Sequence, residues 1–336
     1  MRTALCCWLS LLPILATTGS AQYIAYPQDA TTGSSANNAI LGRNNTGTTD
    51  EVHAQIAIPE AFLPSTGGLV TAIEVASNST VTLPFTSLKI TAANQPATTP
   101  FPSLNTTFAV NLGASPVTVF NQTAFSLNFT LRQWTRVTFT TPFYYVAGNH
   151  LVLDFQKVIG TAATGGPAHY VASDRVPYDL PIMMVAFGAL NSGAVNATAN
   201  TSTGARQPPR LRVFFLNTPT TVLSSQNDWR LGTSVTITTR SSPNAIFAQL
   251  LEVASSGLSQ RATPLKLPSI AGAGWVLPGP NLVPIVQGTT TTGTTATTLT
   301  IPNLPGLSGK VLVCQSVLAD PVAGLGWTNA VDARMQ

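Results

Sequence analysis

The stretch Arg136-Val137-Thr138-Phe139-Thr140 places Val137 and Phe139 on one side of an extended chain and threonines on the other. Successive side chains of a β-strand point to opposite faces of a sheet, so this alternation predicts a strand with one buried and one solvent-facing side. Threonine suits the exposed side, because its branched Cβ fits the pleated surface while its hydroxyl faces water.

The same alternation recurs along the chain, and convincing amphipathic helices are scarce. Glycine and proline, 25 of each, separate the alternating runs about every ten residues. This pattern predicts an all-β protein made of antiparallel sheets packed as sandwiches. The clearest further runs are 52–58, 69–76, 88–92, 125–129, 150–155 and 210–215.

A polar stretch at 217–230 divides the chain, and the strand pattern restarts at Ser234–Thr238. We therefore predict two antiparallel β-sandwich domains. The first is jelly-roll-like and covers 22–217, a linker follows at 218–230, and the second is immunoglobulin-like and covers 231–336. The Thr-, Gly- and Ala-rich run Gly288–Thr298 is interpreted as a long hairpin loop, with a glycosylated stalk as the alternative.

Residues 1–21 have the layout of a signal peptide. Arg2 supplies a positive charge, Ala4–Ala16 is almost wholly apolar, and Gly19 and Ala21 are the small residues expected before a cleavage site. The apolar run is too short for a transmembrane helix, which needs about 20 residues. We expect a secreted or cell-surface protein with no membrane span.

Cys314 is the one cysteine outside the predicted signal peptide, so the exported chain has no partner for an internal disulfide. Its neighbours Val311, Leu312 and Val313 predict a strand in which the cysteine is a small buried hydrophobe.

The composition excludes several classes of protein. Only 8% of the residues are charged, against about 25% in ordinary soluble domains. The formal net charge of +4 is thinly spread, and no Lys/Arg cluster is present to follow a phosphate backbone, so no nucleic-acid partner is expected. Disorder caused by charge repulsion does not fit this composition either, because 44% of the residues are hydrophobic.

Eight stretches carry a resemblance to known proteins. They are Phe108–Leu112, Val117–Phe120, Trp134–Phe139, Pro142–Tyr145, Gly148–Phe155, Ile301–Gly309, Cys314-Gln315 and Gly326–Ala330. These stretches resemble a broad group of exported two-domain β proteins found in planctomycete-type environmental bacteria. The resemblance covers most of the chain after residue 21 and implies the fold and export, but almost no activity, because the group is largely uncharacterised. The group often has a cysteine pair in the second domain, which this chain lacks.

Motifs for known chemistry are missing. The three histidines, His53, His150 and His169, are not spaced as metal ligands, and no nucleophile elbow or P-loop occurs. We interpret His53 and His150 as hydrogen-bonded structural residues. Asp29, Asp50 and neighbouring Asn oxygens are of the type that calcium accepts, but no loop motif marks such a site. The sequence thus predicts no catalytic set, no metal and no cofactor.

One segment, Gly165–Pro181, is unusually rich in polar and aromatic side chains for this chain. As a ligand-facing loop, it would stack tyrosine rings on sugar faces and fix hydroxyls with the charged groups. As an internally paired connection, it would bind Arg175 to a neighbouring aspartate, and we favour this second interpretation. The candidate binding residues are His169, Tyr170, Asp174, Arg175, Tyr178 and Asp179.

A second candidate patch groups Trp134 with Tyr144 and Tyr145, for which core packing is the favoured alternative. Seven Asn-x-Ser/Thr sequons occur, and they would matter as N-glycosylation sites only if the source were eukaryotic. They begin at Asn44, Asn78, Asn105, Asn121, Asn128, Asn196 and Asn200.

Three hypotheses for function follow. The favoured one is a secreted, non-catalytic β protein that acts as a surface, matrix or adhesion component. The second is a carbohydrate-binding, lectin-like module with polysaccharide or cell-surface partners. The third is a secreted hydrolase with an unrecognised site around His169 and Asp174. Self-assembly through threonine-rich edge strands is a further expectation.

Overall fold

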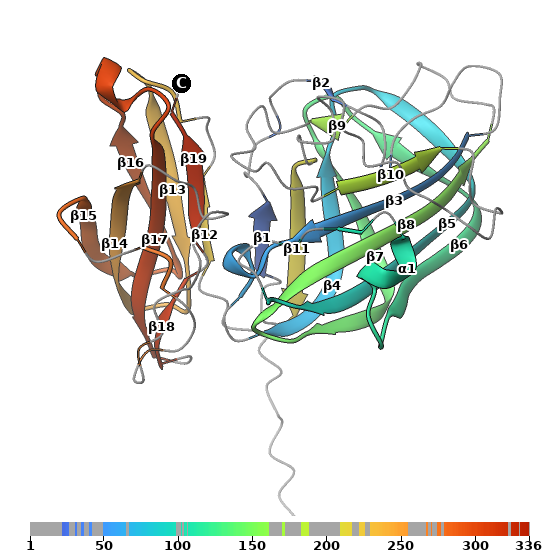
Figure 1. Cartoon of the computed structure of the whole chain (residues 1–336), viewed down its shortest axis with the longest axis horizontal. Helices are drawn as coiled ribbons and strands as arrows, with labels where there is room; N and C mark the ends of the chain where they lie inside the picture. The colour runs from blue at the N-terminus through green and yellow to red at the C-terminus, as the bar shows by residue number, and fades with distance from the viewer. Residues whose placement is uncertain are drawn as a thin grey trace, which may run out of the picture.

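The computed structural model shows a chain built almost wholly of antiparallel β-strands, which confirms the predicted all-β fold (Figure 1). Among the described residues, no helix is both long and apolar enough to span a lipid bilayer. The residues that the structure describes are 22–26, 31, 35–36, 40–41, 50–64, 67–98, 102, 104–105, 107–160, 170–171, 183–187, 209–216, 222–225, 229–254, 267, 270, 274–276, 279–321, 324–328 and 330–335.

The first part of the chain forms two facing sheets. A four-stranded sheet has the order β1-β11-β4-β7, and a five-stranded sheet has the order β10-β3-β8-β5-β6. The strands of the first sheet are β1 (Gln22–Tyr26), β11 (Leu211–Leu216), β4 (Gly68–Ala76) and β7 (Trp134–Tyr145). Those of the second are β10 (Met183–Phe187), β3 (Asp50–Ile58), β8 (Asn149–Ile159), β5 (Val81–Pro96) and β6 (Val117–Phe129).

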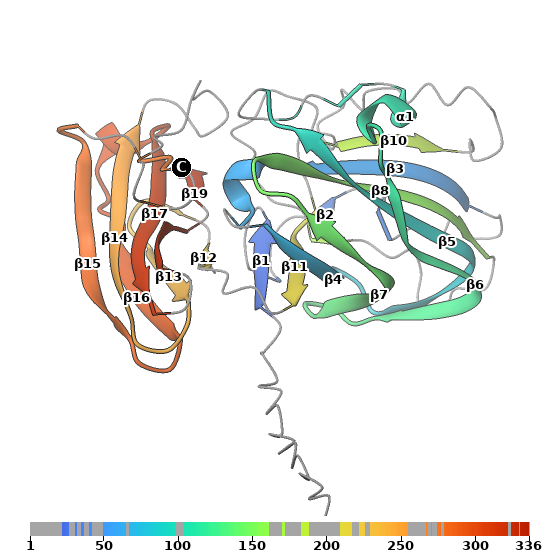
Figure 2. The same ribbon diagram turned by 90° about the horizontal axis from the view of Figure 1, so that it is seen from below.

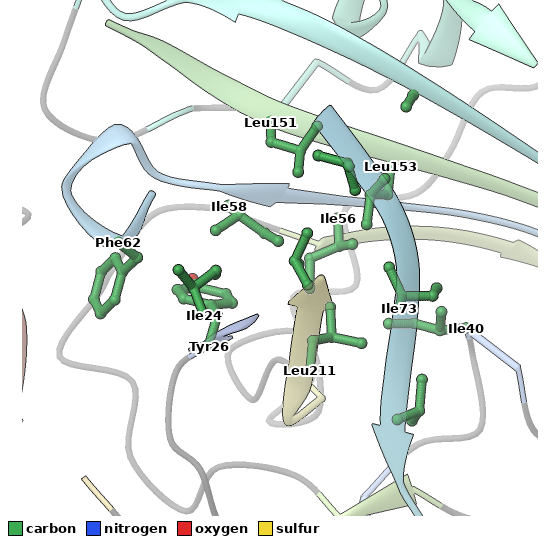
Figure 3. Close-up of a cluster of buried hydrophobic side chains, with 14 of the residues drawn as sticks. Ile24, Tyr26, Ile40, Ile56, Ile58, Phe62, Ile73, Leu151, Leu153 and Leu211 are labelled. Atoms are coloured by element: carbon green, nitrogen blue, oxygen red, sulfur yellow. The ribbon is translucent and has the colours of Figure 1, made fainter. Parts of the chain in front are cut away.

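The core between these sheets consists of the apolar side of each alternating strand. In β3, Val52, Ala54, Ile56 and Ile58 are fully buried, and Leu151 and the following odd-numbered apolar residues of β8 lie beside them. Figure 3 shows isoleucines and leucines from β3, β8, β4 and β11 pointing into one apolar space. Burial of each large apolar side chain contributes about 1.5–3 kcal/mol to the free energy of folding, so this core holds the two sheets together face to face.

The later part of the chain forms a second pair of sheets (Figure 2). One has the order β12-β13-β16, and the other has the order β15-β14-β17-β18, with β19 also paired to β17. The strands are β12 (Val222–Ser225), β13 (Ser234–Arg240), β16 (Thr294–Thr300), β15 (Leu282–Thr290), β14 (Ala245–Ala254), β17 (Val311–Asp320), β18 (Gly324–Trp327) and β19 (Val331–Arg334).

The Gly288–Thr298 run contains the end of one strand, a short turn and most of the next strand, so its interpretation as a long hairpin loop is wrong. The two strands belong to different sheets. Its first residues close β15, and Thr294 onward forms β16, which pairs with β13. The turn depends on Gly293, which has a φ of 80° and whose added Cβ would lie 2.8 Å from the Ser241 carbonyl oxygen. Only glycine adopts such a conformation at so close an approach without strain.

β12 lies inside the stretch 218–230 that was expected to be a linker, and it pairs with β13.

Cys314 is fully buried in β17, as predicted, and burial raises the pKa of its thiol to about 12.

Short elements complete the described fold. They are the helix α1 (Phe108–Asn111), the 3-10 helices η1 (Glu60–Phe62) and η3 (Pro305–Leu307), and the two-residue strands β2 (Ser35–Ala36) and β9 (Tyr170–Val171), which pair with each other.

The two pairs of sheets contact one another. The Ala330 N–H donates to the Ala61 carbonyl oxygen at 2.9 Å. Trp275, Trp327 and Ala330 belong to the same buried apolar cluster as the core of the first pair. Apolar burial is therefore continuous from one pair of sheets to the other.

Candidate functional site

The Gly165–Pro181 candidates are mostly outside the described residues. His169, Asp174, Arg175, Tyr178 and Asp179 are among the residues that are not described. The backbone of Tyr170 lies in β9, where it pairs with Ala36. A ligand-facing role for this segment remains a prediction.

The structure separates the three aromatic residues of the second candidate patch. Tyr145 is a core residue, as the packing interpretation expected: it is buried, and its hydroxyl donates to the Asn149 carbonyl oxygen at 2.8 Å. Burial and the nearby Glu60 carboxylate raise the pKa of its phenol well above the ordinary value. Tyr144 is 60% exposed, and Trp134 is half-buried on the outer face of the four-stranded sheet.

That outer face carries a concentration of arginine and aromatic side chains, which we call the arginine–aromatic face. Its members are Tyr23, Glu74, Trp134, Arg136, Arg212, Phe214 and Arg240. Strand alternation brings them together: in β11, Leu211, Val213 and Phe215 are fully buried in the core, so the intervening Arg212 and Phe214 point outward. In β7, Val137 and Phe139 are buried, so Trp134 and Arg136 point outward.

The centre of the face is a charged row across three strands. Arg212 of β11 is opposite Glu74 of β4, and Glu74 is opposite Arg136 of β7. Arg212 Nη1 donates to Glu74 Oε2 at 3.3 Å, and Arg136 Nη1 donates to Oε1 at 3.5 Å. One carboxylate therefore orients two guanidinium groups, and cross-strand opposite charges of this kind stabilise a sheet.

Aromatic rings flank each guanidinium of the row. Arg136 Cζ lies 4.0 Å from the ring centroid of Phe214, and Arg212 Cζ lies 4.2 Å from that of Trp134 and 4.4 Å from that of Tyr23. The Tyr23 and Phe214 centroids are 5.2 Å apart. Cation–π contacts of this geometry contribute about 0.5–1 kcal/mol at exposed sites, and they hold the guanidinium planes in place.

Arg240 extends the face to the second pair of sheets. This residue ends β13, and its Nη2 donates to the Tyr23 hydroxyl oxygen at 2.9 Å, with Cζ 4.6 Å from the Tyr23 ring centroid. Tyr23 thus lies between guanidiniums from two parts of the chain. The arrangement presents planar hydrogen-bond donors on the outer face of the sheet.

A buried polar network on the outer face of the five-stranded sheet was also missed by sequence reasoning. His53 Nε2 and Asp154 Oδ1 are 2.6 Å apart, and Gln55 Nε2 donates to the same oxygen at 2.7 Å. The carboxylate and the imidazole lie on neighbouring strands, 101 residues apart in the sequence. Strand alternation indicated that His53 and Gln55 share a face, but nothing local indicated their partner.

This network fastens α1 to the sheet. Gln55 Nε2 also donates to the Phe108 carbonyl oxygen at 2.9 Å, and Asn111 Nδ2 donates to Gln55 Oε1 at 2.8 Å. The Phe108 ring stacks on the His53 imidazole with a centroid distance of 3.8 Å. His53 and Asp154 are almost fully buried beneath this cover. These hydrogen bonds and the ring contact attach α1 to the sheet, which agrees with the interpretation of His53 as a hydrogen-bonded structural residue.

His150 is likewise hydrogen-bonded, with its Nδ1 accepting from the Glu60 backbone N–H at 3.0 Å. Within the described part of the chain, no group of three or more His, Cys, Asp or Glu side chains is placed to hold a metal ion. Asp29 and the side chain of Asp50, which the calcium hypothesis needs, lie outside what the structure describes.

Comparison with known proteins adds little. No family model matches the chain, and no curated protein matches it. Among solved structures, the chain is similar to a Faecalibacterium prausnitzii beta-glucuronidase, with 9% sequence identity and a TM-score of 0.23. The match covers 85% of this chain but 37% of that protein, so the chain spans little more than a third of its length. A TM-score this low supports no argument about activity.

Proposed function

We propose that the protein is an exported, non-catalytic surface or matrix component that adheres by binding carbohydrate through the arginine–aromatic face. The observation that carries the proposal is the interleaving of Arg136 and Arg212 with the rings of Phe214, Trp134 and Tyr23. Guanidiniums donate several hydrogen bonds in fixed directions, which suits sugar hydroxyls and acidic substituents. The rings beside them hold these guanidinium planes in position.

The shape of the surface favours a polymer over a small sugar. Small-molecule sites are concave and enclose most of the ligand. The arginine–aromatic face lies on the outside of a sheet and spans β1, β11, β4 and β7, with Arg240 added from β13. An extended polysaccharide can contact such a surface along several repeating units.

The proposed architecture is a jelly-roll-like sandwich at 22–217 and an immunoglobulin-like sandwich at 231–336, exported after removal of residues 1–21. Support for the first comes from the orders β1-β11-β4-β7 and β3-β8-β5-β6, in which early and late strands lie side by side. Support for the second comes from its two short sheets and their antiparallel pairing. Membership of the planctomycete-type group is part of the same proposal.

The test is retention on a panel of insoluble neutral and acidic polysaccharides. Trp134→Ala removes a ring that packs on Arg212, so we expect retention to fall about tenfold, the size of one lost contact of about 1.4 kcal/mol. Tyr144→Ala is the matched control, because Tyr144 is an exposed aromatic on the same strand outside the face. Unchanged melting temperatures show that both variants are folded. Failure of the unmodified protein to bind any member of the panel contradicts the proposal.

A further inference from the structure

We infer that the ligand of the arginine–aromatic face is an anionic polysaccharide, one that carries carboxylate or sulfate groups, and that Arg136 makes its main contact. This inference rests on the proposed function and names the class of ligand. It follows from which groups of the face are exposed, which are covered, and how the guanidiniums are held.

Arg136 is the most accessible charged group of the row. Its side chain is 42% exposed, against 21% for Arg212 and 13% for Glu74. Its bond to Glu74, at 3.5 Å, is at the long limit of a hydrogen bond. Within the described residues, Nη1 is the one nitrogen of Arg136 seen to make a hydrogen bond. Donors on the remaining edge of this guanidinium are therefore available to a ligand.

The plane of that guanidinium is set before any ligand arrives. The Phe214 ring supports it from one side at 4.0 Å, and Glu74 Oε1 lies 3.5 Å from Nη1 at one end. A planar fork with fixed orientation suits the two oxygens of a carboxylate or sulfate, which accept parallel hydrogen bonds. A preorganised group also loses less conformational entropy on binding.

The rings themselves are poorly placed to stack on a neutral sugar. Phe214 is only 6% exposed and lies against Arg136. Trp134 and Tyr23 are both half-buried and both lie against the Arg212 guanidinium. A ligand that approaches the face therefore meets guanidinium before it meets an open ring surface.

The charge of the row points the same way. Arg212, Glu74 and Arg136 together carry a net positive charge, and the whole chain has a formal net charge of +4 although only 8% of its residues are charged. Charge-assisted hydrogen bonds are roughly twice as strong as neutral ones. An anionic substituent thus gains more from this surface than a hydroxyl does.

The experiment compares three soluble polymers that share one backbone: dextran, carboxymethyl-dextran and dextran sulfate. Affinity is measured for the purified protein by retardation in native gels that contain each polymer. We expect binding to one or both charged polymers, at least about tenfold tighter than to dextran, and weakened by salt. Arg136→Gln should reduce the affinity for the charged polymer about tenfold. The affinity of Arg136→Lys should lie between those of the unmodified protein and Arg136→Gln, because lysine keeps the charge but lacks the planar fork.

Lys310→Gln is the matched control, since it removes one exposed positive charge in the second pair of sheets. Equal losses in Lys310→Gln and Arg136→Gln would mean binding by net charge alone and would overturn the assignment of the site. Equal affinity for dextran and its charged forms would overturn the inference while leaving the proposed function intact. Binding that is confined to the neutral members of the insoluble panel would likewise overturn the inference and leave the proposed function intact. No binding to any polysaccharide in either assay contradicts the proposed function itself.

Discussion

At the scale of single residues, burial decides the chemistry of Cys314. The thiol is fully buried in β17, and its pKa is raised to about 12 because the thiolate would have no access to water. The thiolate is the reactive form of cysteine, so the native protein should not react at pH 8 with a thiol reagent such as iodoacetamide. Mass spectrometry of the peptide that contains Cys314 measures this. Labelling in the native protein at the rate seen in 6 M guanidinium would contradict it.

The same raised pKa makes stability depend on pH in one direction. Above about pH 9, the unfolded chain ionises Cys314 while the folded chain retains the proton. The folded state then binds more protons, and the free energy of unfolding falls as the pH rises from about 9 toward 12. Tyr145, whose pKa is also raised, acts in the same direction. Urea midpoints at pH 7.5 and pH 10 should show the loss, and a Cys314→Ala variant should show less of it.

Residue types alone were a poor guide to the candidate site. Arg212 and Glu74 are 138 residues apart, and their contact depends on the register of β11 on β4. Alternation correctly predicted which side chains face outward, but a cross-strand partner depends on topology. The Gly165–Pro181 segment was singled out because polar residues are adjacent there in the sequence. The arginine–aromatic face is as polar, but its members come from five strands.

At the scale of elements, strands were predictable where the alternation involved large apolar residues. The run 52–58 became β3, and 136–140 lies within β7. The Thr-rich run 288–298 was wrongly interpreted as a loop because its composition resembles that of a low-complexity segment. Its threonines alternate between exposed and half-buried positions in β16, and cross-strand pairing with β13 supplies the order that the apolar pattern did not show.

The attachment of α1 gives a prediction at this scale. Gln55→Met keeps the side-chain volume but leaves the Phe108 carbonyl and the Asn111 amide without their buried partner. An unsatisfied buried group costs about 1–3 kcal/mol, so the free energy of unfolding should fall by about 2–3 kcal/mol. Amide hydrogen exchange at Val110 and Leu112 should also accelerate, because α1 loses its attachment to the sheet.

The matched control for this variant is Gln122→Met, which makes the same change at an exposed position of β6. It should alter the free energy of unfolding by less than about 0.5 kcal/mol. Equal effects of the two substitutions in urea denaturation would show that the network does not hold α1.

At the scale of the whole molecule, the continuous apolar core makes the two pairs of sheets depend on each other. Trp327, in β18, is buried in the cluster that also contains Ile56 and Phe155 of the first pair. The Ala330–Ala61 hydrogen bond and the Arg240–Tyr23 contact lie across the same boundary. Elements that share a core tend to unfold together, so we expect one cooperative transition for the whole chain.

Trp327→Ala tests this coupling. Truncation of a buried Trp costs about 3–5 kcal/mol. If the halves are coupled, opening free energies from native-state hydrogen exchange should fall together for amides in β8 of the first pair and β14 of the second. A fall confined to β14, with β8 unchanged, would show that the sandwiches unfold independently. Coupling would also fix Arg240 relative to Tyr23, and the arginine–aromatic face would then extend over both parts as a single surface.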